Sequence, residues 1–209
     1  IIVSYGEKEK YNILIDGGQG RVCFRQLCSY VDSIKRAGEK IDLLILTHID
    51  SDHIDGILRL LSRKEFDFSM IREIWFNFGR GLQEIYGIKN GNYQVNLYNN
   101  TTEISWKQGV DLEEKIEKEG VKRRIVTKLE KILVGDATIT ILSPSKDILK
   151  KFFEQVSEEK KDTTEIAYSN DYKNSIVELN QKEEEKQVSL TNKSSIACLI
   201  ESESANILL

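Results

Sequence analysis

The chain has 209 residues, of which 40% are hydrophobic and 31% charged, and its 30 basic and 34 acidic side chains give a formal net charge of −4. This composition can supply the core of one domain, which excludes a wholly disordered chain, and the charge balance excludes a generally basic protein that coats nucleic acid. The longest apolar runs, such as residues 43–46, are too short to span a membrane. We therefore expect a single domain over residues 1–209.

The first 80 residues alternate between strand and helix patterns. The predicted elements are a hairpin over residues 1–5 and 11–15, an amphipathic helix over 22–38, a strand buried on both faces over 41–46, a helix over 54–61 and a strand over 71–78. This order predicts an α/β fold built on a layered sheet.

The rest of the chain has a weaker pattern. We expect a surface loop over residues 79–103, a helix over 108–119, two strands over 132–142, a helix from the N-cap Ser145 to Glu154, a charged insertion over 157–187, and strands over 195–200 and 206–209. The chain begins and stops within apolar runs, whereas natural termini are usually polar. We therefore expect it to be a piece of a longer chain that could carry further domains.

Three cysteines, Cys23, Cys28 and Cys198, lack the CxxC spacing of metal or redox motifs. Such a sparse, odd set indicates thiols in a reducing compartment, so we expect a cytoplasmic protein. Cys23 and Cys28 fall on the apolar stripe of the first predicted helix, which predicts that both are packing residues.

The strongest chemical signal is the segment Thr47-His48-Ile49-Asp50-Ser51-Asp52-His53-Ile54-Asp55-Gly56, which contains the only two histidines and directly follows a buried strand. Imidazole and carboxylate ligands together suit Zn²⁺, Mn²⁺ or Fe. In an extended turn His48 and Asp50 would point the same way and could share one ion. Asp52 and His53 could then hold a second ion, about 3.5–4 Å away.

An alternative is that the acidic residues of this loop simply cap the next helix, a role open to Asp52 or Asp55, with the histidines incidental. Three carboxylates this close need a cation or raised pKa values, which favours the metal site over the cap.

Together with Leu14-Ile15-Asp16-Gly17-Gly18, this segment resembles the metallo-β-lactamase-fold hydrolases, whose usual signature is Thr-His-x-His-x-Asp-His-x-x-Gly after a strand-end Asp-x-Gly. Asp50 stands where most members have His, which resembles the subgroup in the C-terminal domain of DNA-uptake competence channel proteins. The resemblance implies an αββα sandwich that is incomplete at its C-terminus.

The resemblance also implies roles for single residues. His48 and Asp50 would bind the first metal, and Asp52 and His53 the second, with Asp52 also orienting the attacking hydroxide. Asp16 would hydrogen-bond to the ligand loop from behind, or alternatively only make the turn before two glycines. The family's third His has no counterpart at Ser143-Pro144, and its bridging Asp would follow Leu209, so these ligands lie beyond the chain or the site is incomplete.

The implied function is a metal-dependent hydrolase with two divalent ions, Zn or Mn, with Mg or Fe as alternatives. It would activate water to attack a phosphodiester or related ester, with nucleic acid as one candidate substrate. The alternative is a catalytically degenerate module of the same fold that serves as an interaction or scaffold domain of a larger protein. A segment of this chain that crosses a membrane is not expected.

Two weaker features could bind nucleic acid. The basic run Lys122-Arg123-Arg124, with Lys128 and Lys131, could contact phosphates, although such a run is more often a solvated face. Three aromatic residues could stack on bases, although aromatic residues in a strand usually belong to the core. They are Trp75, Phe76 and Phe78.

Overall fold

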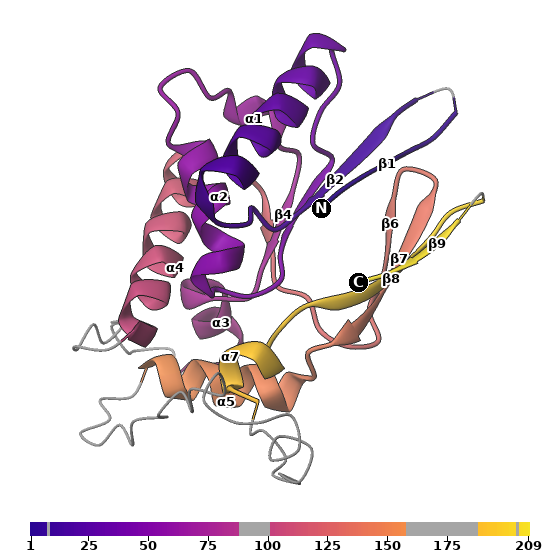
Figure 1. Cartoon of the computed structure of the whole chain (residues 1–209). Coiled ribbons are helices and arrows are strands. Elements are labelled where there is room, and N and C mark those ends of the chain that lie inside the picture. The colour runs from indigo at the N-terminus through magenta and orange to yellow at the C-terminus, as the bar shows by residue number, and fades with distance from the viewer. Residues whose placement is uncertain (8, 88–100, 158–187, 204) are drawn as a thin grey trace, which may run out of the picture.

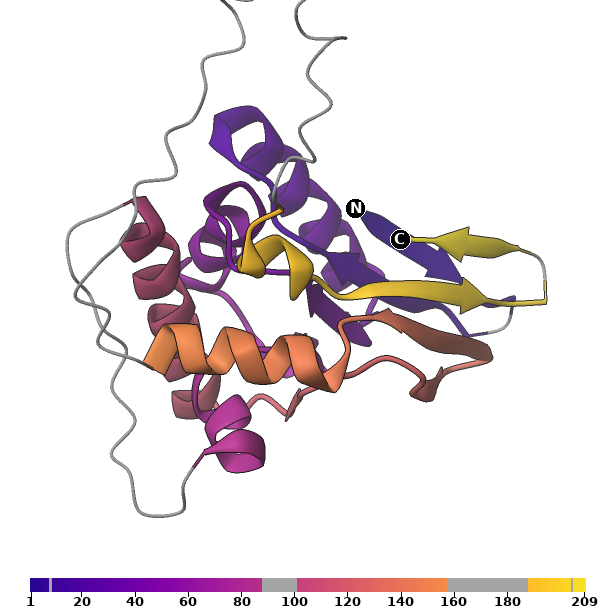
Figure 2. The ribbon, with the colours of Figure 1, turned by 90° about the horizontal axis from the view of Figure 1, so that it is seen from below.

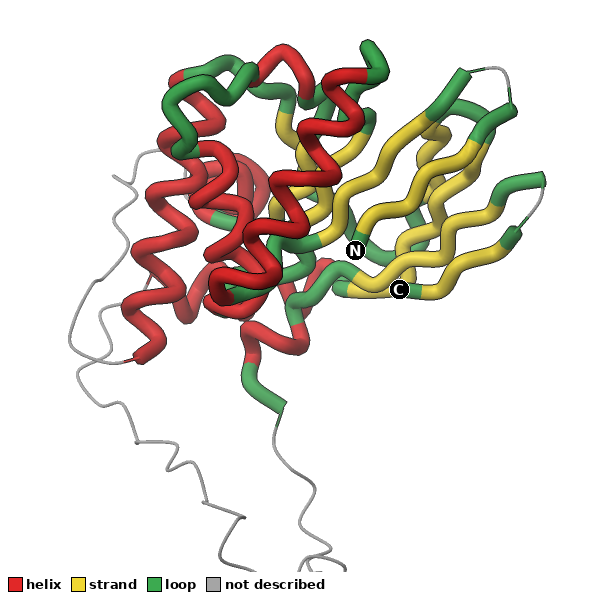
Figure 3. The backbone as a smooth tube through the Cα atoms, turned by 45° about the horizontal axis from the view of Figure 1, so that its top comes forward, coloured by secondary structure: helices red, strands yellow, loops and turns green. Residues whose placement is uncertain are grey.

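The computed structural model describes residues 1–7, 9–87, 101–157, 188–203 and 205–209. Their strands form two sheets, one of order β1-β2-β3-β4-β5 and one of order β6-β7-β8-β9. Helices gather on the far side of the first sheet, so that the described residues form a helix–sheet–sheet arrangement (Figures 1 and 3). The predicted α/β fold is confirmed.

The first sheet contains a hairpin followed by parallel strands. Its members are β1 (Ile2–Tyr5), β2 (Tyr11–Ile15), β3 (Leu43–Leu46), β4 (Ile74–Phe76) and β5 (Arg123–Arg124). β1 and β2 pair antiparallel, whereas β2 to β5 run parallel, with Ile15 opposite Ile45 and Leu46 opposite Phe76. Parallel strands present their carboxyl ends at one edge of a sheet, and the candidate site forms there.

β3 is buried on both faces, as its continuous apolar sequence predicts. Leu44 and Leu46 pack into the cluster beneath the helices, while Leu43 and Ile45 pack into the cluster between the two sheets. Alternate residues of one strand therefore join two cores, because successive side chains point to opposite faces. This double burial fixes the strand that carries the histidine segment.

The helices cover one face of the first sheet. They are α1 (Gly20–Arg36), α2 (Ser51–Leu61), α3 (Gly79–Tyr86), α4 (Thr101–Lys118), α5 (Lys146–Ser157) and the short α7 (Leu190–Lys193), with a 3₁₀ turn η1 (Phe68–Met70). α1 buries Leu27, Val31 and Ile34, the stripe expected from its periodicity. Within the described residues, no helix combines the length and apolar character needed to cross a membrane.

The second sheet is antiparallel throughout. It contains β6 (Lys131–Val134), β7 (Ala137–Ser143), β8 (Ala197–Glu201) and β9 (Asn206–Leu208). Its inner residues, such as Ile139 and Ile200, pack on the first sheet, whereas Leu133 is 72% exposed on the outer face. Among the described residues no helix lies on that outer face, so they supply three layers of the expected four-layered sandwich (Figures 1 and 2).

Three local predictions need correction or lie outside the described residues. The loop predicted over 79–103 is wrong at both ends, since α3 begins at Gly79 and α4 at Thr101. Residues 88–100, and the insertion predicted at 157–187 apart from its first residue, are not among the described residues. Cys23 is exposed rather than a packing residue, because it lies in the first turn of α1 and the buried stripe of that helix begins at Leu27.

Candidate metal centre

The histidine segment leaves the end of β3 and continues directly into α2. Residues 47–50 form the connection, and Asp50 occupies the N-cap position without a side-chain capping bond. Asp52 lies in the first turn of the helix, where its charge complements the helix dipole, and Asp55 faces Arg59 one turn later at 3.5 Å. Neither Asp52 nor Asp55 therefore caps α2, so the predicted capping role is wrong.

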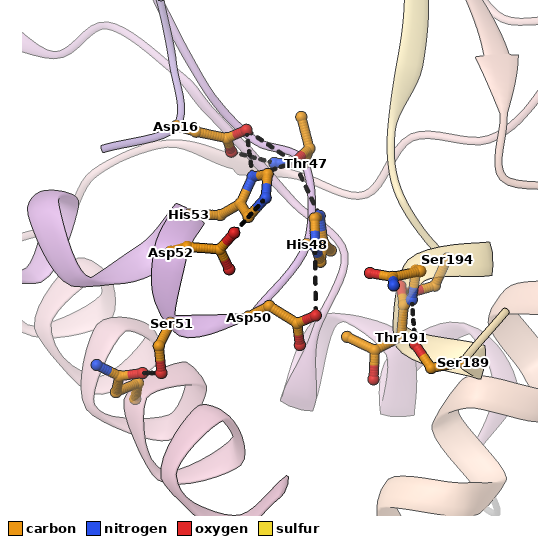
Figure 4. A network of polar contacts seen from close by, with 12 residues as sticks. Asp16, Thr47, His48, Asp50, Ser51, Asp52, His53, Ser189, Thr191 and Ser194 are labelled. Atoms are coloured by element: carbon orange, nitrogen blue, oxygen red, sulfur yellow. Dashed lines mark hydrogen bonds and ion pairs between the residues drawn. The ribbon is translucent and has the colours of Figure 1, made fainter. Parts of the chain in front are cut away.

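Asp16 follows the neighbouring strand β2 and reaches across to this connection. One carboxylate oxygen accepts the Thr47 backbone N–H at 2.8 Å, and the other accepts the Thr47 hydroxyl at 2.9 Å and contacts His53 Nδ1 at 2.7 Å (Figure 4). Asp16 has a positive φ of 54°, a backbone conformation that costs energy for a residue with a side chain. Its carboxylate thus ties two strand ends and α2 together.

Two glycines bring α2 against the turn after Asp16. The Gly17 N–H donates to the His53 carbonyl at 2.8 Å, and the Gly56 N–H donates to the Gly18 carbonyl at 3.0 Å. A Cβ atom on Gly56 would lie 2.1 Å from the Gly17 carbonyl oxygen, closer than real Cβ contacts. The His53 side of the site is therefore held by backbone contact that only glycine allows.

The structure brings the predicted metal ligands together as two pairs. His48 Nε2 lies 3.6 Å from Asp50 Oδ2, and His53 Nε2 lies 3.5 Å from Asp52 Oδ2. The two imidazole rings are neighbours, with centroids 3.9 Å apart (Figure 4). These are the pairings expected from the sequence.

The charges around His53 alter its acidity. The hydrogen bond to Asp16 raises the pKa of His53 above its ordinary value, although burial acts in the opposite direction. The charges of Asp16, Asp52 and Asp50 add to the increase in pKa. The ring therefore lies in a field that favours positive charge.

The chemistry of these donors fits a divalent cation, but their number is small. A neutral His53 that donates its Nδ1–H to Asp16 presents a lone pair on Nε2 to the Asp52 carboxylate, and two such acceptors repel unless a cation lies between them. Yet no group of three or more His, Cys, Asp and Glu side chains within the described ranges could hold an ion by itself. Catalytic zinc commonly has three protein ligands, so each pair would need a further one.

Polar side chains from distant parts of the chain surround the pairs. The Ser51 hydroxyl donates to Gln108 of α4 at 2.9 Å, and Ser194, at the end of α7, lines a narrow space together with His48. Figure 4 shows Ser189 and Thr191 on the same side as Ser194, on the His48 and Asp50 side of the site. Sequence reasoning missed these residues because no motif links them to residues 47–56.

The basic run and the three aromatic residues, which were weaker candidates for nucleic-acid binding, make other contacts in the structure. Glu73 pairs with Lys122 at 2.5 Å and with Arg124 at 2.7 Å, and Glu113 pairs with Arg123 at 2.5 Å. These ion pairs occupy part of the basic run, although the Lys122 side chain is still 65% exposed, so a phosphate contact by this run stays a prediction. The three aromatic side chains Trp75, Phe76 and Phe78 are at most 1% exposed, so they belong to the core and cannot stack on bases.

A family model described as the metallo-beta-lactamase superfamily matches residues 3–149. Members of this superfamily are generally hydrolases that depend on divalent metals, often zinc. Among solved structures, the chain is similar to a metallo-beta-lactamase from Staphylococcus aureus subsp. aureus COL, with 13% identity, a TM-score of 0.33, and coverage of 98% of this chain and 39% of that one.

Among curated proteins, the chain is similar to microtubule-associated protein 1A of Rattus norvegicus, Mus musculus and Homo sapiens. Each is 44% identical over 55 residues, which is 26% of this chain. The chain spans about 2% of the length of these relatives.

Proposed function

The chain belongs to the metallo-beta-lactamase superfamily, and we propose from this premise that it is a hydrolase with a binuclear metal centre. The proposed ligands are His48 and Asp50 for one ion, and Asp52 and His53 for the other. The proposed substrate is a phosphodiester, with nucleic acid as a candidate. The two facing imidazole–carboxylate pairs are the observation that supports this proposal most directly.

With neutral imidazoles, each pair places two hydrogen-bond acceptors side by side, and a cation would satisfy both. Each Nε2 atom lies 3.5 or 3.6 Å from a carboxylate oxygen. This distance is too long for a good hydrogen bond, yet it leaves the acceptor lone pairs close together. A divalent ion beside each pair would satisfy both acceptors at once. Two ions bound at neighbouring rings would suit the separation of about 3.5–4 Å seen in two-metal hydrolytic sites.

The residues of this chain would prepare the centre rather than perform the whole reaction. Bound ions would lower the pKa of a water and polarise the scissile group. Asp16 holds the Nδ1 proton of His53, which leaves Nε2 free to act as a ligand. Asp52 is 68% exposed in its side chain, so it can reach an attacking water as well as an ion.

Two features favour a phosphodiester as the substrate. Asp50 in place of a histidine makes the ligand set richer in oxygen, which suits Mn²⁺ or Mg²⁺, ions that commonly act on phosphates. Ser189 and Thr191 lie on the Asp50 side of the site (Figure 4), and their hydroxyls could donate hydrogen bonds to phosphate oxygens, while that of Ser189 also accepts the Asn192 N–H at 3.1 Å.

A double variant, Asp52→Ala with His53→Ala, tests the proposal. We expect it to lose stoichiometric Mn²⁺ or Zn²⁺ and to abolish metal-dependent hydrolysis of a chromogenic phosphodiester. Asp55→Ala is the matched control, since this carboxylate lies on the same helix but faces Arg59; it should keep both properties. Hydrolysis at the wild-type rate in the double variant would contradict the proposal.

A second candidate is an interaction module of the same fold without catalysis. It is favoured because no group of three or more metal-capable side chains gathers in the described part of the chain. Elemental analysis after Mn²⁺ or Zn²⁺ reconstitution separates the two candidates. A hydrolase should retain close to stoichiometric metal, whereas a scaffold should retain none.

A further inference from the structure

Thr47 occupies the centre of the polar network at the candidate site. Its hydroxyl oxygen lies 2.9 Å from Asp16 Oδ2 and 3.0 Å from His48 Nδ1. The same oxygen is 3.3 Å from His53 Nδ1, although that nitrogen has the shorter contact, 2.7 Å, with Asp16. One hydroxyl thus lies between one carboxylate and two imidazoles (Figure 4).

The number of hydrogen atoms in this network determines which group donates and which accepts in each hydrogen bond. An ionised carboxylate can only accept, so the single hydroxyl hydrogen of Thr47 is donated to Asp16. The Thr47 oxygen can then only accept from its other neighbour, which makes His48 Nδ1 the donor. A neutral His48 that carries its hydrogen on Nδ1 has a lone pair on Nε2.

We propose that Thr47 is a positioning residue whose hydroxyl sets the tautomer of His48, so that Asp16 fixes both imidazoles: His53 directly, and His48 through Thr47. This inference rests on the proposed function only for its consequence, which is that both Nε2 atoms are free to bind metal. The assignment of the tautomer itself does not require a metal.

The backbone of Thr47 is anchored, so its hydroxyl has little freedom to turn elsewhere. The Thr47 N–H donates to Asp16 Oδ1 at 2.8 Å, and the Thr47 carbonyl accepts from the Ile196 N–H at 2.9 Å. The contact with Ile196 joins the end of β3 to the segment that enters β8. Thr47 is thereby held between the two sheets of the sandwich.

Loss of the hydroxyl should make His48 exchange its tautomer. The side chain of His48 is only 9% exposed, so an Nδ1–H without its acceptor would be left poorly solvated. With the hydrogen on Nε2, the ring could instead donate to Asp50 Oδ2, at present 3.6 Å away. That bond would occupy both groups proposed as ligands of the first ion.

NMR of the ring nitrogens in ¹⁵N-labelled, metal-free protein tests the assignment directly. The spectra are recorded at increasing pH until the ring-nitrogen shifts no longer change, which identifies the neutral form of each ring. We expect the wild-type protein to carry hydrogen on Nδ1 of both histidines. A wild-type His48 protonated on Nε2 would overturn the proposal before any variant is made.

Thr47→Val and Thr47→Ser separate the hydroxyl from the shape of the side chain. Valine keeps the volume without the acceptor, and we expect it to move the hydrogen of His48 to Nε2 while His53 stays unchanged. Serine restores the hydroxyl and should restore the wild-type spectrum. A His48 that keeps its Nδ1 hydrogen in a folded Thr47→Val protein would also overturn the proposal.

Metal titration then distinguishes this inference from the proposed function. Thr47→Val should weaken Zn²⁺ or Mn²⁺ binding by about 10–100-fold, the usual cost of losing a residue that orients a ligand, and Thr47→Ser should not. Expected tautomers in a wild-type protein that binds no metal would contradict the proposed function and support the role of Thr47. A Thr47→Val protein that binds metal as tightly as wild type would overturn that role in metal binding.

Discussion

Two polar clusters lie at the first sheet, and their charges are balanced in different ways. In the arginine cluster (Glu73, Glu113, Lys122, Arg123, Arg124), each carboxylate lies against a permanent cation. In the ligand cluster (Asp16, Thr47, His48, Asp50, Asp52, His53), the ion pairs of the carboxylates are with histidines, whose charge depends on pH. The carboxylates of the arginine cluster are therefore neutralised by cations of the chain itself, whereas the ligand cluster can bind a cation from outside.

Breaking the arginine cluster should have the largest effect on stability. Glu113 is 2% exposed and accepts from Arg123 and from the backbone N–H of Arg80 at the start of α3. Glu113→Gln removes the charge but keeps the shape, which leaves Arg123 buried without a counter-ion. We expect a loss of about 3–5 kcal/mol in the free energy of unfolding, measured by urea denaturation.

Glu117→Gln is the control for that variant. Glu117 lies on the same helix and pairs with Arg80, but both side chains are substantially exposed. Its loss should cost less than about 1 kcal/mol. Equal effects of the two variants would mean that the buried pair contributes no more than a surface one.

Gly56→Ala should disturb the ligand cluster by an intermediate amount. The added Cβ would meet the Gly17 carbonyl oxygen at 2.1 Å, so α2 must move away from the turn that carries Asp16. We expect a cost of about 1–3 kcal/mol and a changed ring-nitrogen spectrum of His53. Urea denaturation and NMR measure the two effects.

Gly38→Ala provides the comparison for this variant. A Cβ at Gly38 meets nothing within 4 Å, although its φ of 72° carries a backbone cost of about 1–2 kcal/mol. The Gly38→Ala protein should therefore lose stability with an unchanged His53 spectrum. If Gly56→Ala leaves the spectrum unchanged as well, contact between the glycines does not position His53.

The smallest predicted effect concerns how the contribution of Glu73, in the arginine cluster, to the free energy of unfolding depends on pH. Burial alone would raise the pKa of Glu73, but hydrogen bonds from Lys122, Trp75 and Arg124 outweigh it and lower the pKa below the ordinary 4.5. A carboxylate with a lowered pKa in the folded state stabilises the protein above the unfolded-state pKa. That contribution is lost as the pH falls through the folded-state pKa.

Glu73→Gln should therefore cost about 0.5–1 kcal/mol at neutral pH and almost nothing in acid, because its cationic partners are partly exposed. Urea denaturation across the acid range measures this difference. A variant whose stability falls with acid as steeply as that of the wild type would show that Glu73 is not responsible for that part of the pH dependence.

The predictions that held depend on local pattern. The continuous apolar run of residues 43–46 became a strand buried on both faces, and the second strand predicted within 132–142 became β7 with its buried inner face. The spacing of residues 48–53 predicted that His48 lies near Asp50 and Asp52 near His53, as the distances show, while their role as metal ligands stays a prediction. In each case neighbours in the sequence are neighbours in space.

The predictions that failed depend on distant partners. α3 begins in a segment that looked like a loop, because the Glu113 carboxylate, 33 residues away from Arg80, accepts an N–H of its first turn. The sequence also did not show that Glu73 and Glu113 would form ion pairs with the basic run of residues 122–124. Nothing in the local sequence indicates either contact.

The sequence by itself determined the order of strands and helices over about the first 78 residues, the position of the histidine segment after a buried strand, and the kinds of donor atom present there. These follow from side-chain periodicity and from the chemistry of single residues. Only the tertiary structure decided that Asp16 and Thr47 hold the two imidazoles and that α7 lies on the Asp50 side of the site. Hydrogen-bond direction and charge balance depend on which groups meet across the fold. Asp16 meets Thr47 because β2 pairs with β3, and the α7 side approaches when the second sheet packs on the first.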